Sequence, residues 1–142
     1  MGCGQCQGYA AYGRNSEGVE KRMVKYFFDT YALVELIKRN PKFMPYGEYP
    51  LITTILNKIE LYWWALNFNG EELGRIILNS ISDVQEIPDE VIESAMRFRK
   101  EHRKKDFVYA DAIGYAFARK HNLLFLTGNR QFRDLPGVEF VQ

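Results

Sequence analysis

Short apolar runs alternate with longer segments of helical periodicity along most of this chain. The first run, at 24–28, stops at Asp29, and apolar residues then recur at helical spacing over 30–39. The run at 123–127 is the clearest buried strand, and 138–141 has the composition of a last strand. Strands that alternate with helices indicate a parallel sheet covered by helices.

Four further helices are predicted between the first strand and the run at 123–127. Residues 51–54 are either a short strand or the start of one of these helices, and 84–87 are a weak strand candidate. Asp106 is interpreted as the N-cap of the last of the four, since aspartate accepts bonds from free backbone N–H groups. The segments are 55–66, 71–81, a helix that starts at Pro88, and 107–120.

The composition is that of a single folded domain over residues 23–142. The full chain has 142 residues, of which 46% are hydrophobic, and this is enough to form a core. No apolar run approaches the roughly 18 to 20 residues that span a bilayer. The N-terminus also lacks the order of charged and apolar residues found in signal peptides, so we expect a cytoplasmic protein that does not enter membranes.

Residues 1–22 differ from the rest of the chain. They contain both cysteines and five of the eleven glycines, so we interpret them as a flexible tail or a leader, with Met23 as a possible natural start. Cys3 and Cys6 form a C-x-x-C pair, but a metal site of this kind needs a second pair of ligands. A redox pair would need a strand before it and a helix after it. Two reduced thiols in a tail are therefore the favoured interpretation.

Four polar residues fall where the carboxyl end of the predicted sheet lies: Asp29, Glu60, Asp111 and Asn129. In open α/β sheets, ligands bind in the crevice at the carboxyl ends of the strands. Carboxylates that gather there repel one another unless a cation neutralises them. Mg²⁺ prefers oxygen ligands and keeps bound water, so the pattern predicts a divalent metal site.

Each of these residues also has a purely structural interpretation. Asp29 or Thr30 could simply cap the helix that follows the first strand, and Asn129 could end a strand in a turn. The other two favour a site, because Glu60 lies among apolar and aromatic residues and Asp111 lies in an otherwise uncharged helix. An idle charge is unfavourable in such surroundings. No Ser-His-Asp or Cys-His arrangement is recognisable.

The ordered set of segments resembles the PIN-domain nucleases, especially the VapC-type toxins of prokaryotic toxin–antitoxin pairs and their archaeal relatives. The resemblance covers residues 23–142. It implies a three-layer α/β/α sandwich with a short, mostly parallel central sheet. The segments that carry it are Phe28-Asp29-Thr30, Asn57-Lys58-Ile59-Glu60-Leu61, Tyr109-Ala110-Asp111-Ala112 and Leu126-Thr127-Gly128-Asn129-Arg130-Gln131-Phe132.

The resemblance also implies an endoribonuclease that hydrolyses RNA phosphodiester bonds with Mg²⁺ or Mn²⁺. Asp29, Glu60 and Asp111 would then be catalytic residues that hold the metal, together with Asn129. The hydroxyls of two threonines, Thr30 and Thr127, would support these ligands.

One position departs from the family, which usually has aspartate where this chain has Asn129. A neutral amide can ligate a metal through its oxygen but brings no charge. The site should then bind Mg²⁺ more weakly than a site with one more carboxylate. The alternative function is a catalytically weak or inactive PIN-like module that binds RNA or a protein partner.

A basic segment precedes the helix of Asp111 and is the candidate RNA contact. Residues 97–105 carry six of the nineteen cationic side chains, and such patches bind phosphates through charge and counterion release. A solvated helix end is the structural alternative. The predicted RNA-binding residues are Arg97, Arg99, Lys100, Arg103, Lys104, Lys105 and Arg130, and Arg119 and Arg133 could extend them.

The resemblance further implies a small antitoxin protein as a partner and a homodimer. A surplus of aromatic residues is consistent with an interface, although core packing explains such residues more often. The residues concerned are Tyr62, Trp63, Trp64 and Tyr115.

An aspartyl-phosphate protein, either a phosphatase or a receiver domain, would also place an aspartate after the first strand. The phosphatase pattern needs a second acid two residues later, where Tyr31 stands. A receiver needs an acidic pair before the aspartate and a lysine after a later strand, and neither is found. The sequence therefore favours the PIN-like interpretation.

Overall fold

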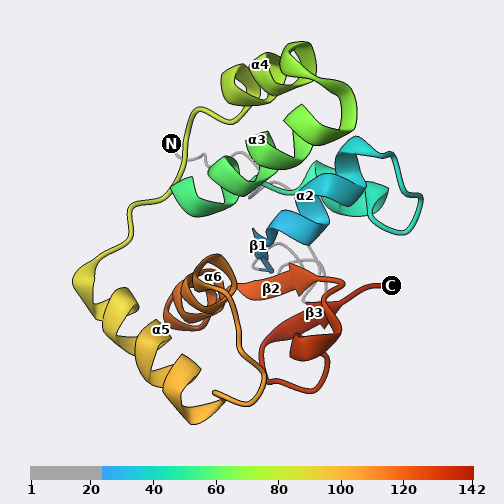
Figure 1. The fold of residues 1–142 in the computed structure, drawn as a ribbon. Helices are drawn as coiled ribbons and strands as arrows, with labels where there is room; N and C mark the ends of the chain where they lie inside the picture. The colour runs from blue at the N-terminus through green and yellow to red at the C-terminus, as the bar shows by residue number, and fades with distance from the viewer. Residues whose placement is uncertain (1–23) are drawn as a thin grey trace, which may run out of the picture.

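The computed structural model describes residues 24–142 and contains both helices and strands (Figure 1). The predictions for residues 1–22, including the cysteine pair and the start at Met23, lie outside this range. No helix in the described range is long and apolar enough to cross a membrane. The elements are β1 (Tyr26–Phe28), α2 (Thr30–Ile37), the 3₁₀ helix η2 (Met44–Glu48), α3 (Ile55–Asn69), α4 (Glu71–Ser80), α5 (Asp89–Glu101), α6 (Tyr109–Lys120), β2 (Leu124–Thr127), the 3₁₀ helix η3 (Arg130–Phe132) and β3 (Val138–Phe140).

The central sheet is short and parallel, as predicted. Its order is β1-β2-β3, with Phe27 opposite Phe125 in the register of the first pair. Two isolated parallel bridges, Phe27 with Ile52 and Thr54 with Gln85, continue the pairing beyond the free edge of β1. Residues 51–54 therefore pair with β1 at one position, and residues 84–87 pair at one position with residues 51–54. Residues 51–54 also lead directly into α3.

Successive strand residues point to opposite faces of the sheet and enter two different cores. Phe27 and Phe125 pack with residues of α5 and α6, including Phe117. Phe28 and Leu126 pack instead with residues of α2, α3 and α4. Figure 1 shows the same division, with α5 and α6 on one side of the sheet and α2 to α4 on the other. The predicted three-layer α/β/α fold is confirmed.

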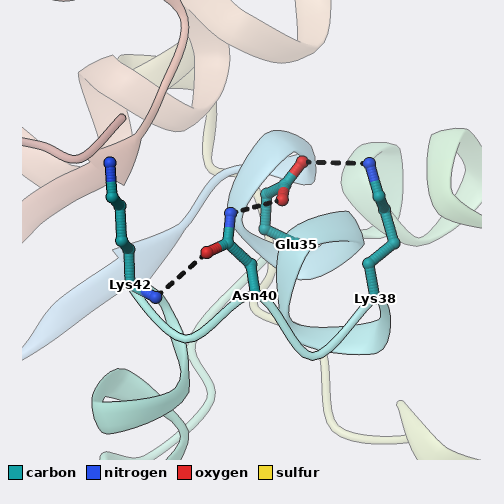
Figure 2. Close-up of polar contacts among 4 residues, drawn as sticks. All are labelled: Glu35, Lys38, Asn40 and Lys42. Atoms are coloured by element: carbon teal, nitrogen blue, oxygen red, sulfur yellow. Dashed lines mark hydrogen bonds and ion pairs between the residues drawn. The ribbon is translucent and has the colours of Figure 1, made fainter.

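Hydrogen bonds of Asn40 close the C-terminal end of α2 (Figure 2). Its amide nitrogen donates to Glu35 Oε1 at 2.8 Å, and its amide oxygen accepts from the backbone N–H of Lys42 at 3.0 Å. Lys38 pairs with the other oxygen of Glu35 at 3.6 Å. Because Asn40 bonds on both sides of the turn, it ties the last turn of α2 to the loop that leads into η2.

Some predicted helix ends differ from the structure. Helix α3 continues to Asn69, where Gly70 ends it at a φ of 87°, and α5 begins one residue after Pro88. The interpretation of Asp106 as the N-cap of α6 is wrong, because Val108 occupies that position. Asp106 is exposed with a φ of 53°, and this left-handed turn lets the next residue, Phe107, enter the core.

Helix α6 lies very close to the sheet at Gly114. A Cβ atom at this position would lie 2.8 Å from the ring of Phe27 and 3.2 Å from the ring of Phe125. Both rings are fully buried and therefore have no free space into which they could move. The absence of a side chain at Gly114 thus allows the close packing that fixes α6, and with it Asp111, against the strands.

Substitution Gly114→Ala should lower the midpoint of thermal unfolding. Overpacking costs about 1 to 3 kcal/mol, and the better helix propensity of alanine offsets only about 1 kcal/mol of this. Gly47→Ala is the matched control, because its nearest neighbour, Leu36 Cδ2, lies at an ordinary 3.7 Å. Circular dichroism melts would contradict this account if Gly114→Ala were as stable as the Gly47 variant.

Candidate functional site

Asp29 lies at the carboxyl end of β1 and is buried, with 2% of its surface exposed. The Thr127 hydroxyl, at the end of β2, donates to Asp29 Oδ2 at 2.7 Å. The other oxygen, Oδ1, is the one buried side-chain polar atom within residues 24–142 that has no hydrogen-bond partner. Asp29 occupies the N-cap position of α2, but its side chain makes no capping hydrogen bond. Capping alone therefore does not explain this residue.

The pKa of Asp29 is raised from 3.8 to about 6, chiefly by burial and to a smaller extent by the nearby charge of Glu60. The Thr127 hydroxyl acts in the opposite direction, as do the backbone N–H groups of Thr30 and Tyr31, which favour the charged form without meeting the geometry of a hydrogen bond to it. Burial is the larger effect, so ionisation of this carboxyl is costly in the folded protein.

Glu60 reaches the same region from α3, where its side chain contacts Thr30. The Thr30 hydroxyl donates to Glu60 Oε1 at 2.6 Å. Thr30 itself accepts a hydrogen bond of 3.0 Å from the side-chain amide of Asn57, which is completely buried. Asn57 is not among the site residues predicted from the sequence. The available signal was an asparagine three positions before Glu60, next to the apolar positions of a helix.

Asp111 comes from the first turn of α6 and is partly buried. Its pKa is raised from 3.8 to about 8, chiefly by burial and then by the charges of Asp29 and Glu60. The amide nitrogen of Asn129 donates to Asp111 Oδ2 at 3.3 Å and lowers the pKa. The structure thus brings the three predicted acids close enough for their charges to repel one another.

Asn129 follows β2 and uses both ends of its amide. Its oxygen accepts from the backbone N–H of Gln131 at 3.0 Å and caps η3, while its nitrogen faces Asp111. Its backbone N–H donates to Thr127 Oγ1 at 3.0 Å. A metal ligand at this position would use the second lone pair of the amide oxygen, because the first accepts the hydrogen bond that caps η3. The role of Asn129 as a ligand stays a prediction.

The oxygen atoms of Asp29, Glu60, Asp111 and Asn129 are of the chemical type that binds divalent cations. No group of three or more His, Cys, Asp or Glu side chains in the described part of the chain is arranged to hold an ion. Two observations nevertheless point to a cation: the unpaired buried oxygen of Asp29 and the raised pKa values of Asp29 and Asp111. A set of oxygen donors suits a hard ion such as Mg²⁺. A cation there would relieve the repulsion between the carboxylates.

Most of the predicted RNA-binding residues form an exposed basic surface at the end of α5. Its residues line a shallow pocket together with Glu101 and His102, and they are Arg97, Lys100, Arg103, Lys104 and Lys105. Lys105 Nζ donates to the backbone oxygen of Gln131 at 2.8 Å, and the Gln131 amide donates back to the Lys105 backbone oxygen. This pair ties the basic surface to η3, beside Asn129.

Two other cationic residues are engaged differently. Arg99 is half-buried, since its Nε donates to the Phe107 backbone oxygen at 2.7 Å and its guanidinium lies 4.5 Å above the ring of Tyr109. Arg130 is exposed and donates to the Gln142 side chain at 3.2 Å. Arg99 therefore has a structural role whatever else it contacts.

The fold and the site together define a class of protein. Its members are three-layer α/β/α proteins with acidic side chains gathered at the carboxyl ends of parallel strands. Within this class, the family model described as PIN domain matches residues 26–138. The chain belongs to the PIN domain family. A comparison with curated proteins found no match.

Several solved structures are similar to this chain in fold. One is a toxin–antitoxin complex from Klebsiella pneumoniae, with 24% identity and a TM-score of 0.65 over 81% of this chain and 96% of that one. Another is VapC20 of Mycobacterium tuberculosis, described as a Sarcin-Ricin loop cleaving toxin, with 16% identity and a TM-score of 0.66 over 81% and 99%. A third is VapBC2 of Rickettsia felis bound to a DNA fragment from its promoter, with 16% identity and a TM-score of 0.65 over 84% and 100%.

The raised pKa values predict that Asp111→Asn stabilises the metal-free protein at high pH. The pKa of Asp111 is higher in the folded protein than in the unfolded chain, so the folded state binds more protons and loses stability as pH rises from about 4 to 8. Asparagine removes this cost. We expect a melting temperature about 3 to 6 °C above wild type at pH 8.5, and a smaller rise at pH 5, where only the first part of this cost is present.

The melts are recorded with a chelator, and Asp134→Asn, at an exposed position, is the matched control. A stabilisation that is the same at both pH values would mean that the Asp111 carboxylate does not carry the cost.

Proposed function

We propose that this protein is a metal-dependent endoribonuclease of the PIN-domain toxin type. The observation that carries the proposal is the group of mutually repelling carboxylates, Asp29, Glu60 and Asp111, at the carboxyl ends of parallel strands. Such a group costs stability and is expected where a function needs it. Membership of the PIN domain family and the likeness to a Sarcin-Ricin loop cleaving toxin support this function.

In this proposal the three carboxylates hold Mg²⁺ or Mn²⁺, and Asn129 is a neutral fourth ligand. A bound divalent ion lowers the pKa of its water and stabilises charge on a phosphoryl oxygen. Asp29 offers its unpaired oxygen, Oδ1, while the Thr127 hydroxyl holds the other oxygen in place. Thr30 orients Glu60 in the same way, and Asp111 completes the set from α6.

The basic surface at the end of α5 would bind the RNA backbone. Its five exposed cations lie on the segment that leads into α6, and Lys105 bonds to η3 beside the site. Phosphate contacts of this kind depend steeply on salt concentration. Arg130, in η3, would extend the same surface.

We also propose that the protein pairs with an antitoxin and forms a homodimer. Two of the similar structures are a toxin–antitoxin complex and a VapBC complex, which supports such a partner. The apolar side chains of Ile55, Ile59 and Trp63 recur every fourth residue along α3 and are exposed, with Trp63 at 67%. Tyr115 is excluded from an interface, because it is buried and donates to the Pro136 backbone oxygen at 2.7 Å.

A second candidate function is a module that binds RNA or a protein without cleavage. Asn129 favours it, since the residue adds no charge to the site and its amide oxygen already caps η3. The two candidates share the fold and the basic surface, so only a cleavage measurement separates them.

Purified protein incubated with single-stranded RNA and Mn²⁺ should cleave the RNA. Asp29→Asn and Asp111→Asn should each reduce the rate at least about a hundredfold, because each removes a charge that the cation requires. Asp134→Asn is the control and should cleave at the wild-type rate. Cleavage that persists in both site variants would overturn the assignment of these acids.

Binding of the RNA without cleavage by the wild-type protein would favour the second candidate. Asn129→Asp then shows whether the missing charge is the cause: it should restore cleavage, or lower the Mn²⁺ concentration at which cleavage is half-maximal.

A further inference from the structure

We propose that Asn57 is a positioning residue that fixes the Glu60 carboxylate through the hydroxyl of Thr30. The proposal rests on the proposed function, because it concerns a ligand of the same metal site. Asn57 is the completely buried member of a chain of side-chain hydrogen bonds that ends at Glu60. The donor and the acceptor of each hydrogen bond can be assigned, and the bonds all run in one direction, from Asn57 through Thr30 to Glu60.

The amide of Asn57 is oriented by Thr54, the residue that precedes α3. The backbone N–H of Thr54 donates to Asn57 Oδ1 at 3.3 Å, and the Thr54 hydroxyl donates to the same oxygen at 2.7 Å. A backbone N–H can only donate, so the atom that it meets must be the amide oxygen. The NH₂ group of Asn57 is therefore the end that faces Thr30.

The Thr30 hydroxyl has a single proton to donate. Its oxygen already accepts the bond from Asn57 Nδ2 at 3.0 Å, so the proton is directed to Glu60 Oε1 at 2.6 Å. A donor at this position fixes one oxygen of the Glu60 carboxylate. Asn57 thus acts on Glu60 without touching it.

The second carboxylate of the site is held by an equivalent arrangement. The backbone N–H of Asn129 donates to Thr127 Oγ1 at 3.0 Å, and the Thr127 hydroxyl donates to Asp29 Oδ2 at 2.7 Å. In both cases an N–H group occupies the threonine oxygen and directs its proton to a carboxylate. A backbone group does this for Thr127, whereas Thr30 depends on the side chain of Asn57.

Helix capping explains only half of the Asn57 side chain. Thr54 and Asn57 form a capping box at the start of α3, and this motif needs the amide oxygen alone. An acidic residue, which has no NH₂ group, caps a helix in the same way as an amide residue does. The cap therefore does not involve the NH₂ group of Asn57. The bond to Thr30 is the use of that group.

The test measures the Mn²⁺ dissociation constant by isothermal titration calorimetry for wild type, Asn57→Ser, Thr30→Val and the double variant. Serine keeps a hydroxyl near Thr54 but removes the NH₂ group. Each single variant should weaken Mn²⁺ binding about tenfold. The double variant should bind no more weakly than either single one, because both break the same chain of bonds. Asn79→Ser, at an exposed position of α4, is the matched control.

The outcomes separate this proposal from the proposed function. A folded Asn57→Ser protein that binds Mn²⁺ like wild type would reduce Asn57 to a capping residue. Effects of Asn57 and Thr30 that add fully in the double variant would show that Asn57 does not act through Thr30. A wild-type protein that binds no Mn²⁺ would contradict the metal site itself. Asn57→Ala replaces Asn57→Ser if the latter does not fold, and it is judged by the same outcomes.

Discussion

The repulsion between buried and partly buried carboxylates is the constraint on which this site depends. The fold places Asp29 at the end of β1, Asp111 at the start of α6 and Glu60 on α3, and burial together with their mutual charge raises the pKa of Asp111 to about 8. Gly114 lets α6 pack directly against the rings of the sheet, and this packing fixes the position of Asp111. A cation bound at the site would relieve this repulsion, and the relief would contribute to the free energy of its binding.

Hydroxyl groups keep the carboxylates in place while they repel one another. Thr127 holds Asp29 and Thr30 holds Glu60, each with a short hydrogen bond and each with its oxygen occupied by an N–H donor. Hydrogen bonds to the charged form oppose the effect of burial. Neutral groups thus preorganise the proposed metal site, and the negative charge of its carboxylates remains for a bound cation to neutralise.

The sequence predicted the fold and Asp29 from the same pattern, whereas Glu60 and Asp111 were predicted from their uncharged surroundings and from the resemblance to the PIN domains. An apolar run followed by an acid marks the carboxyl end of a strand, and parallel strands bring such ends to one edge of the sheet. Asn57 could not be found in this way, because its partner Thr30 is identified only once α2 and α3 are placed side by side. The cap at Asp106 failed since burial of the next residue, Phe107, outweighed local capping preference.

The most direct measurement is the change in melting temperature when Mn²⁺ is added at pH 8 and at pH 5. If the carboxylates form a metal site, Mn²⁺ should raise the melting temperature at pH 8, where a bound ion stabilises the folded state alone. The rise should largely disappear at pH 5, where Asp29 and Asp111 hold protons. A wild-type protein that Mn²⁺ does not stabilise at pH 8, or an Asp29→Asn variant that it stabilises equally, would contradict this account.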